Sequence, residues 1–217
     1  MVDDLHEAED GPADASDKPT NRRARRQAEM RERLIRSALR LFAERGFTAT
    51  TVEDITNLAD VGKGTFFNYF PSKEHVFAAR ARGQAEAVEE FVAEARGSTE
   101  SMCELFYQLA MTLSEGFEVS PAIFQSILVA VSSNDVVRGM LSEALEQARV
   151  PLAELMAIGQ RRGEIRNDHT PAELAMLFQR SFFGTVFLWS VAPARPLSDC
   201  LRETASFLVS PVRKGLE

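Results

Sequence analysis

The 217-residue sequence contains only two cysteines and three histidines, and both shortages narrow the choice of protein classes. Cys103 and Cys200 are far apart and share no short motif, which excludes a disulfide-rich scaffold and favours reduced thiols, with a single bridge left open. His6, His75 and His169 stand at no ligand spacing from one another or from the cysteines. We therefore expect neither a metal site nor a cofactor.

Long apolar runs are scarce too. The longest, MLFQRSFFGTVFLWSV at residues 176–191, is interrupted by Arg180 and falls short of a membrane span. The first residues are acidic and polar, unlike those of a secretory signal peptide. We therefore expect a soluble cytoplasmic protein with no membrane partner.

Recognisable catalytic patterns are missing as well, because the sequence has no G-x-S-x-G elbow and no paired-carboxylate signature. The tetrapeptide GKGT at residues 62–65 resembles part of a phosphate-binding loop. It lacks the first glycine of that loop, and Gly64 stands where Ser or Thr should follow the lysine. We therefore do not expect an enzyme.

The pattern that is present is helical. Apolar residues recur every three or four positions without convincing strand alternation, which predicts an all-α protein. Gly46 should end the first helix, Pro71 the third and Gly163 a long later one, which Pro151 should kink or split. Thr170 should cap the next helix, in a capping box with Glu173. After the first, helices are expected at about residues 51–58, 63–70, 73–96, 99–117, 121–132, 135–162, 171–192 and 196–210.

Charge is distributed unevenly over a chain whose formal net charge is −7. Residues 1–18 carry seven carboxylates and one lysine, whereas residues 21–45 carry nine arginines and three glutamates. Residues 1–20 have almost nothing to bury and are predicted to form a disordered acidic tail. A basic segment beside an acidic one indicates an anionic partner.

Two short helices follow the basic segment. The first is expected to start at Thr50 or Thr51, with Thr50 and Glu53 forming a capping box, and to bury Val52, Ile55 and Leu58. The second is followed by Ser72, which should cap the long helix after it. Two short helices around a three-residue turn indicate a helix-turn-helix, although a hairpin inside an ordinary helical bundle has the same pattern.

The second short helix lies in the stretch VGKGTFFNYFPSKEHVF at residues 61–77 and crowds aromatic rings beside lysines. At 100° per residue, Phe66 and Phe70 share one face and should pack inward. The opposite face presents Gly64, Thr65 and Asn68. A glycine for close approach and small polar groups for base edges are what a helix needs in the major groove of DNA.

The segment GFTATTVEDITNLADVGKGTFFNYFPSKEHVF, residues 46–77, resembles the DNA-binding domain of the TetR family of bacterial transcriptional regulators. Phe67 stands where that family very often has a tyrosine whose hydroxyl reaches a phosphate, so Tyr69 is left to make this contact. The resemblance implies DNA-facing positions at Thr51, Lys63, Thr65, Phe67, Asn68, Tyr69 and Lys73.

The segment NRRARR at residues 21–26 is expected to contact the same DNA, either along the phosphates or in a minor groove. Its four arginines are Arg22, Arg23, Arg25 and Arg26. The acidic tail is expected to aid solubility, and competition with DNA for this basic segment is the alternative.

The remaining residues are expected to form a dimerisation and ligand-binding domain. The helix at 171–192 is apolar nearly all round and the helix at 196–210 is amphipathic. Two copies of this pair should form a four-helix interface across a two-fold axis, and the resemblance implies the same helices. Such a dimer suits a palindromic operator, with recognition helices about 34 Å apart. Candidate residues for a hydrophobic effector are Tyr107, Met111, Phe124, Gln125, Phe178, Phe182 and Trp189.

These observations predict three segments: a tail at 1–20, a helix-turn-helix domain at 21–78, and a helical effector-binding and dimerisation domain at 79–217. The expected function is that of a ligand-responsive, DNA-binding repressor that acts as a homodimer. Two alternatives stay open, an all-helical small-molecule carrier or enzyme and a DNA-binding protein without an effector.

Overall fold

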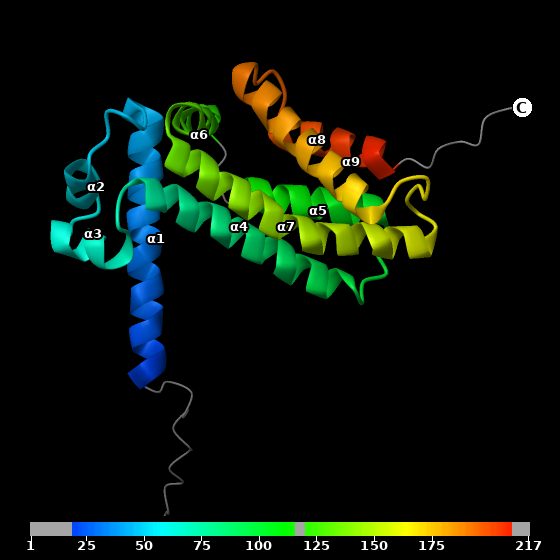
Figure 1. Cartoon of the computed structure of the whole chain (residues 1–217), viewed down its shortest axis with the longest axis horizontal. Coiled ribbons are helices and arrows are strands. Elements are labelled where there is room, and N and C mark those ends of the chain that lie inside the picture. Colours follow the sequence, from blue (N-terminus) through cyan, green and yellow to red (C-terminus); the bar gives the residue numbers. More distant parts are fainter. Residues whose placement is uncertain (1–18, 116–119, 210–217) are drawn as a thin grey trace, which may run out of the picture.

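The computed structural model describes residues 19–115 and 120–209, in which every regular element is an α-helix, as the sequence predicts. Figure 1 shows α1 at one end of the molecule with α2 and α3 beside it, and α8 and α9 toward the other end. The helices are α1 (Pro19–Arg45), α2 (Val52–Leu58), α3 (Lys63–Tyr69), α4 (Glu74–Ala95), α5 (Met102–Glu115), α6 (Pro121–Ser133), α7 (Asp135–Arg162), α8 (Pro171–Val191) and α9 (Leu197–Val209).

Most of the helix ends follow from single residues. Gly46 and Gly163 adopt left-handed backbone conformations with φ of 84° and 72°, which end α1 and α7. Phe70 is extended, with φ −138° and ψ 123°, because the following Pro71 excludes the helical region. Thr170 caps α8 in the predicted box with Glu173.

Thr51 is the N-cap of α2, one of the two residues expected there, but two predicted caps are wrong. The capping box of α2 joins Thr51 to Asp54, not Thr50 to Glu53. Thr50 is buried, and its hydroxyl donates to the carbonyl oxygens of Leu41 and Gly46 at 3.3 and 2.8 Å, which ties the loop to the end of α1. Helix α4 begins after Lys73 rather than Ser72, without a side-chain cap.

Three further expectations change. Leu58 was expected inside but is 42% exposed, because Ile55, Thr56 and Ala59 form the buried side of α2. Helix α7 continues through Pro151 as one element, so the proline does not split it. Helix α8 is long and apolar enough to cross a membrane by length and composition, against the expectation; its buried side packs against α6, α7 and α9, and a core helix passes the same test.

The predicted tail extends two residues too far, since Pro19 and Thr20 already belong to α1. Its residues 1–18 lie outside the described part of the chain.

The buried apolar residues form two clusters. The head cluster joins α1, α2, α3 and the start of α4, and contains a stack of Phe42 on Phe77 with ring centroids 4.9 Å apart. The body cluster lies among α4, α5, α7, α8 and α9, and includes Phe124 of α6. Ala130 of α6 and Val137 of α7 belong to the head cluster, so the larger domain completes the core of the smaller one.

Candidate DNA-binding surface and ligand pocket

Helix α3 is held from beneath by two phenylalanines. Phe66 is fully buried and Phe70 is 2% exposed, and both belong to the head cluster with Ile55. The ring centroids of Phe66 and Phe70 lie 5.6 Å apart, one turn along the helix. The predicted inner face of α3 is therefore confirmed.

The opposite face of α3 is open to solvent. Lys63, Gly64 and Asn68 are exposed, and the Phe67 ring is 54% exposed, while Thr65 and Tyr69 are half-buried. Apart from the backbone of α3 itself, a Cβ added at Gly64 would meet no atom of the described residues within 4 Å. Packing inside the chain therefore does not require a glycine at this position. The glycine nevertheless makes α3 less stable than an alanine would, by about 1 kcal/mol.

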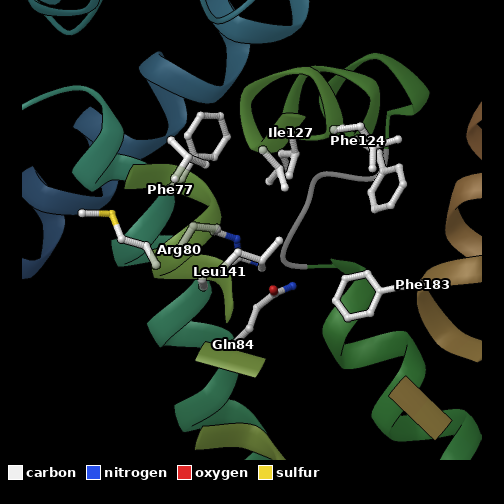
Figure 2. Close-up of a pocket in the computed structure, with 12 residues that line it drawn as sticks. Phe77, Arg80, Gln84, Phe124, Ile127, Leu141 and Phe183 are labelled. Carbon is white, nitrogen blue, oxygen red and sulfur yellow. The ribbon is translucent and has the colours of Figure 1, made fainter. Parts of the chain in front are cut away.

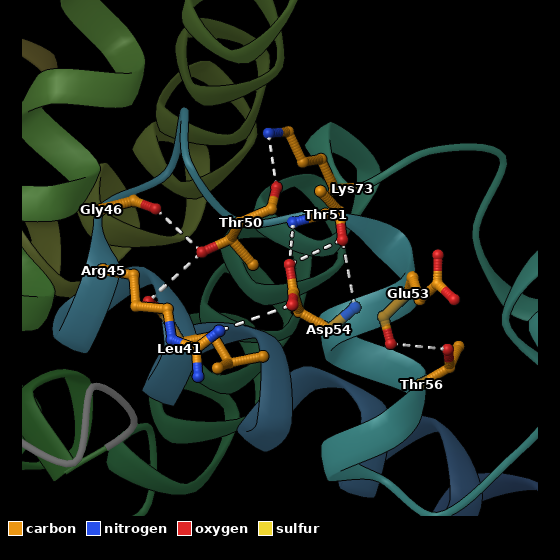
Figure 3. A network of polar contacts seen from close by, with 9 residues as sticks. All are labelled: Leu41, Arg45, Gly46, Thr50, Thr51, Glu53, Asp54, Thr56 and Lys73. Atoms are coloured by element: carbon orange, nitrogen blue, oxygen red, sulfur yellow. Dashed lines mark hydrogen bonds and ion pairs between the residues drawn. The ribbon is translucent and has the colours of Figure 1, made fainter.

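The start of α2 is fixed by a small polar network that Figure 3 shows. The Thr51 hydroxyl donates to the Asp54 carboxylate at 2.6 Å and accepts from the Asp54 amide at 3.1 Å. The Asp54 carboxylate accepts from the Thr51 hydroxyl and, at 2.8 Å, from the Thr51 backbone N–H; these two hydrogen bonds, and then the charge of Arg45, lower the pKa of Asp54. The adjacent Glu53 accepts from the Lys63 ammonium at 2.9 Å, which links α2 to α3.

Lys73 is turned toward the loop between α1 and α2. Its ammonium donates to the carbonyl oxygens of Phe47 and Thr50, both at 2.8 Å, and to that of Thr48 at 3.4 Å. It also lies 4.5 Å from the centre of the Phe47 ring. Lys73 thus fastens the loop that presents Thr51, which is a structural role that the sequence pattern did not indicate.

The predicted basic segment forms the first turns of α1, where residues 22–29 are all exposed. One of its four arginines, Arg25, donates to Glu29 at 2.9 Å on the same helix and does not line the groove beside it. The other three line an open groove of about 660 Å³ between α1 and α3, together with Gln27, Met30 and Tyr69. The groove arginines are Arg22, Arg23 and Arg26.

The larger domain contains an apolar cavity of about 80 Å³ that α4, α6, α7 and α8 enclose (Figure 2). A second cavity, of about 50 Å³, adjoins it and shares Ala81, Gln84, Leu141 and Phe183. The first cavity is lined by Phe77, Arg80, Ala81, Gln84, Phe124, Ile127, Leu128, Val131, Val137, Met140, Leu141 and Phe183.

Three of the candidate ligand residues line these cavities, Phe124 the first and Phe178 and Phe182 the second. The other four, Tyr107, Met111, Gln125 and Trp189, line neither of the two.

Each of those four has other surroundings. Tyr107 lies under the Arg202 guanidinium at 3.6 Å, and Met111 packs against the body cluster. Gln125 donates to the Ser190 carbonyl at 2.6 Å, and the Trp189 indole donates to the Arg195 carbonyl at 3.0 Å.

Sequence reasoning missed the polar residues of the cavity, Arg80 and Gln84. They stand one turn apart on α4, after Phe77, and this i, i+3, i+7 spacing beside a buried aromatic was the available signal. Burial lowers the pKa of the Arg80 guanidinium, and the negative charge of Glu32 opposes that effect. Arginine keeps its positive charge in proteins, so Arg80 brings a cation to an otherwise apolar wall.

Helices α8 and α9 expose an apolar surface at the other end of the molecule. The side chains of Phe207 and Leu188 are 81% and 68% exposed, and clustered apolar side chains with this much exposure are typical of an interaction surface. The exposed apolar residues of this surface are Leu177, Phe187, Leu188, Val191 and Phe207.

The two cysteines of the sequence, Cys103 and Cys200, are both half-buried free thiols.

Comparison with known proteins agrees with this geometry. A family model described as "Bacterial regulatory proteins, tetR family" matches residues 34–79, which span the buried part of α1 through the start of α4. In structure, the chain is similar to Thermus thermophilus FadR, a TetR-family transcriptional repressor in complex with lauroyl-CoA. The TM-score is 0.60 at 26% identity, covering 86% of this chain and 98% of that one.

Two curated relatives match beyond the helix-turn-helix. The HTH-type transcriptional repressor DhaR of Mycobacterium sp. is 29% identical over 182 residues, covering 79% of this chain and 88% of the relative. The HTH-type transcriptional repressor KstR2 of Rhodococcus jostii is 30% identical over 166 residues, covering 73% and 78%. The chain therefore belongs to the TetR family of bacterial helix-turn-helix transcriptional regulators.

Proposed function

We propose that the protein is a cytoplasmic, homodimeric repressor that binds a palindromic operator and releases it when a small molecule enters the cavity of the larger domain. The observation that carries this proposal is the exposed face of α3, where Gly64 is open to solvent and Tyr69 borders the arginine groove. Family membership supports DNA binding as the activity of that face.

On this proposal the two parts of the surface have different tasks. Gly64 lets α3 approach the base pairs, where Thr65 and Asn68 meet base edges and the Phe67 ring lies on a thymine methyl. Lys63, Tyr69 and the groove arginines contact phosphates, which position the protein without reading sequence. Thr51 adds a phosphate contact from the start of α2, and Lys73 acts mainly through the loop that it fastens.

Dimerisation would use the apolar surface of α8 and α9. Two copies of this surface facing each other across a two-fold axis would remove Leu188, Val191 and Phe207 from water. The resulting four-helix contact would hold two α3 helices about one DNA turn, or 34 Å, apart.

The cavity favours a ligand with an apolar body and one anionic head. Aromatic and aliphatic side chains form most of its wall, and Arg80 and Gln84 supply the polar groups. The bound lauroyl-CoA of the Thermus thermophilus relative is a ligand of that general chemistry. A volume of about 80 Å³ has room for only a few water-sized groups, so a larger ligand must widen the space between α4, α6 and α7.

Helix α6 connects such a widening to the DNA-binding end. Phe124, Ile127 and Leu128 line the cavity, and the neighbouring Ser126 is buried and donates to the Phe42 carbonyl of α1. A ligand that displaces α6 would strain this contact and shift α1, and with it α3. Differential affinity for the two arrangements would supply the free energy of release.

DNA selection tests the proposal. Random duplexes retained by the full-length protein are sequenced, and we expect an enriched inverted repeat that the Asn68→Ala variant fails to enrich to the same degree. Laurate and lauroyl-CoA then serve as ligand probes, and at least one is expected to raise the operator Kd. Absence of any enriched sequence would favour a carrier or enzyme, and a complex indifferent to anionic amphiphiles would contradict the proposed ligand class.

A further inference from the structure

We infer that the acidic segment at residues 1–18 competes with DNA for the arginine groove between α1 and α3. The inference rests on the proposed function, because it assigns the same groove to DNA phosphates. It adds an internal regulator that lowers the affinity of the protein for every DNA sequence.

The groove is built to take negative charge. Arg22, Arg23 and Arg26 line it together with Tyr69, and no Asp or Glu is among the described residues that line it. The first turn of α1 has no acidic residue in the described part of the chain, so the backbone N–H groups and the positive end of the helix dipole add to the same field.

The acidic segment matches this surface in charge. It carries seven carboxylates against one lysine, and it contains few apolar residues that could instead pack on the protein. Carboxylates and DNA phosphates seek the same arginine donors, so both cannot occupy the groove together.

The acidic segment is also within reach. Its last carboxylate, Asp17, stands two residues before α1 begins at Pro19. Arg22 and Arg26 follow Pro19 by three and seven residues, which is about 5 and 10 Å along the helix axis. Flexible linkers of 18 residues in general have a root-mean-square span of about 21–25 Å, so this number of residues is enough for the carboxylates of the acidic segment to reach the groove. Such a tether gives an effective concentration on the order of millimolar.

Competition of this kind has an electrostatic signature. The contacts are exposed ion pairs, whose attraction weakens once the Debye length falls below about 10 Å near 0.1 M salt. The acidic segment should therefore inhibit DNA binding strongly at low salt and weakly at high salt.

The test compares four proteins on one operator duplex by fluorescence anisotropy: the full chain, a deletion of residues 2–17, and both again with Arg22→Ala, Arg23→Ala and Arg26→Ala. We expect the deletion to tighten operator binding about tenfold at 50 mM salt and less than about threefold at 300 mM. In the triple-alanine background the deletion should change the Kd less than about twofold.

A fifth protein controls for length, with each carboxylate of residues 2–17 replaced by the matching amide. We expect it to bind as tightly as the deletion variant. An unchanged Kd on deletion, or a gain that the amide variant does not reproduce, overturns the inference while operator binding by the full chain still supports the proposed function. Failure of all five proteins to bind any duplex would instead reject both.

Discussion

The four arginines at the start of α1 should contribute unequally to DNA binding. Arg22, Arg23 and Arg26 line the groove beside α3, whereas Arg25 lies outside it and donates to Glu29 at 2.9 Å. Each phosphate contact releases counterions and adds about 0.9 to the slope of log K against log salt. Three contacts in each protomer of a dimer would therefore contribute about 5.4 to that slope. This contribution corresponds to an about 10³-fold loss of affinity when salt rises from 50 to 200 mM.

The measurement is an operator titration by fluorescence anisotropy at several salt concentrations between 50 and 200 mM. Arg22→Ala, Arg23→Ala and Arg26→Ala together should flatten the slope by about 5, and Arg25→Ala should change it by less than about 1. Asn68→Ala is the matched base-contact control, because it should weaken specific binding without altering the slope. An Arg25→Ala variant that flattens the slope as much as each single groove substitution would refute the unequal contribution of these arginines. So would a triple variant that leaves the slope unchanged.

Four further predictions concern stability and coupling. Phe66→Ala should lower the unfolding free energy by about 3–5 kcal/mol in urea titrations, and Phe67→Ala by less than about 0.5 kcal/mol; equal losses would contradict the assignment of inner and outer faces. Gly159→Ala should lower the unfolding free energy, in the same titrations, by about 1–3 kcal/mol, because the new Cβ would lie 2.3 Å from Ile165 Cδ1. Gly139→Ala is the control, because its Cβ would meet nothing within 4 Å and should leave the unfolding free energy unchanged or raise it. The Arg166 guanidinium lowers the pKa of Asp168 from 3.8 to about 2, so the ionised Asp168 stabilises the fold above pH 4 and this stabilisation is lost as the pH falls toward 2. The Tm of Asp168→Asn should therefore depend less on pH between 4 and 2 than the Tm of the unaltered protein, and parallel Tm curves would rule this out. Ser126→Ala should reduce the ligand-induced rise in operator Kd about fivefold, because it removes a buried hydrogen bond of about 1 kcal/mol between α6 and α1. If the ratio of the operator Kd with ligand to that without ligand is unchanged, this hydrogen bond does not couple the cavity to the DNA-binding end.

Local chemistry was sufficient to predict most of the fold. Gly46, Gly163, Pro71 and Thr170 each restrict the backbone by themselves, so the helix ends next to them can be read without knowledge of the tertiary structure.

The start of α2 shows where that approach fails. Thr50 and Thr51 have the same capping chemistry, and the choice between them depends on carbonyl groups at the end of α1, which the Thr50 hydroxyl reaches. Lys73 is similar, because its ammonium is satisfied by carbonyls more than 20 residues earlier in the sequence. Long-range partners of this kind leave no periodic signal.

The candidate ligand residues were harder still to predict. A single sequence gives the apolar faces of α4, α6, α7 and α8, but not how each helix is rotated against its neighbours. Phe178 and Phe182 face the space between helices, whereas Tyr107 and Trp189 make contacts elsewhere. Arg80 was overlooked because a charged residue on a helix normally faces water.

The placement of Ala130 and Val137 in the head cluster limits how modular the protein is. Truncation after the start of α4 would expose apolar atoms that these two residues now cover, and the isolated fragment would lose part of its own interior. Exchange of DNA specificity between related regulators should therefore succeed only when α6 and the first turn of α7 are transferred together with α1 to α3, or when both parents carry compatible side chains at this seam.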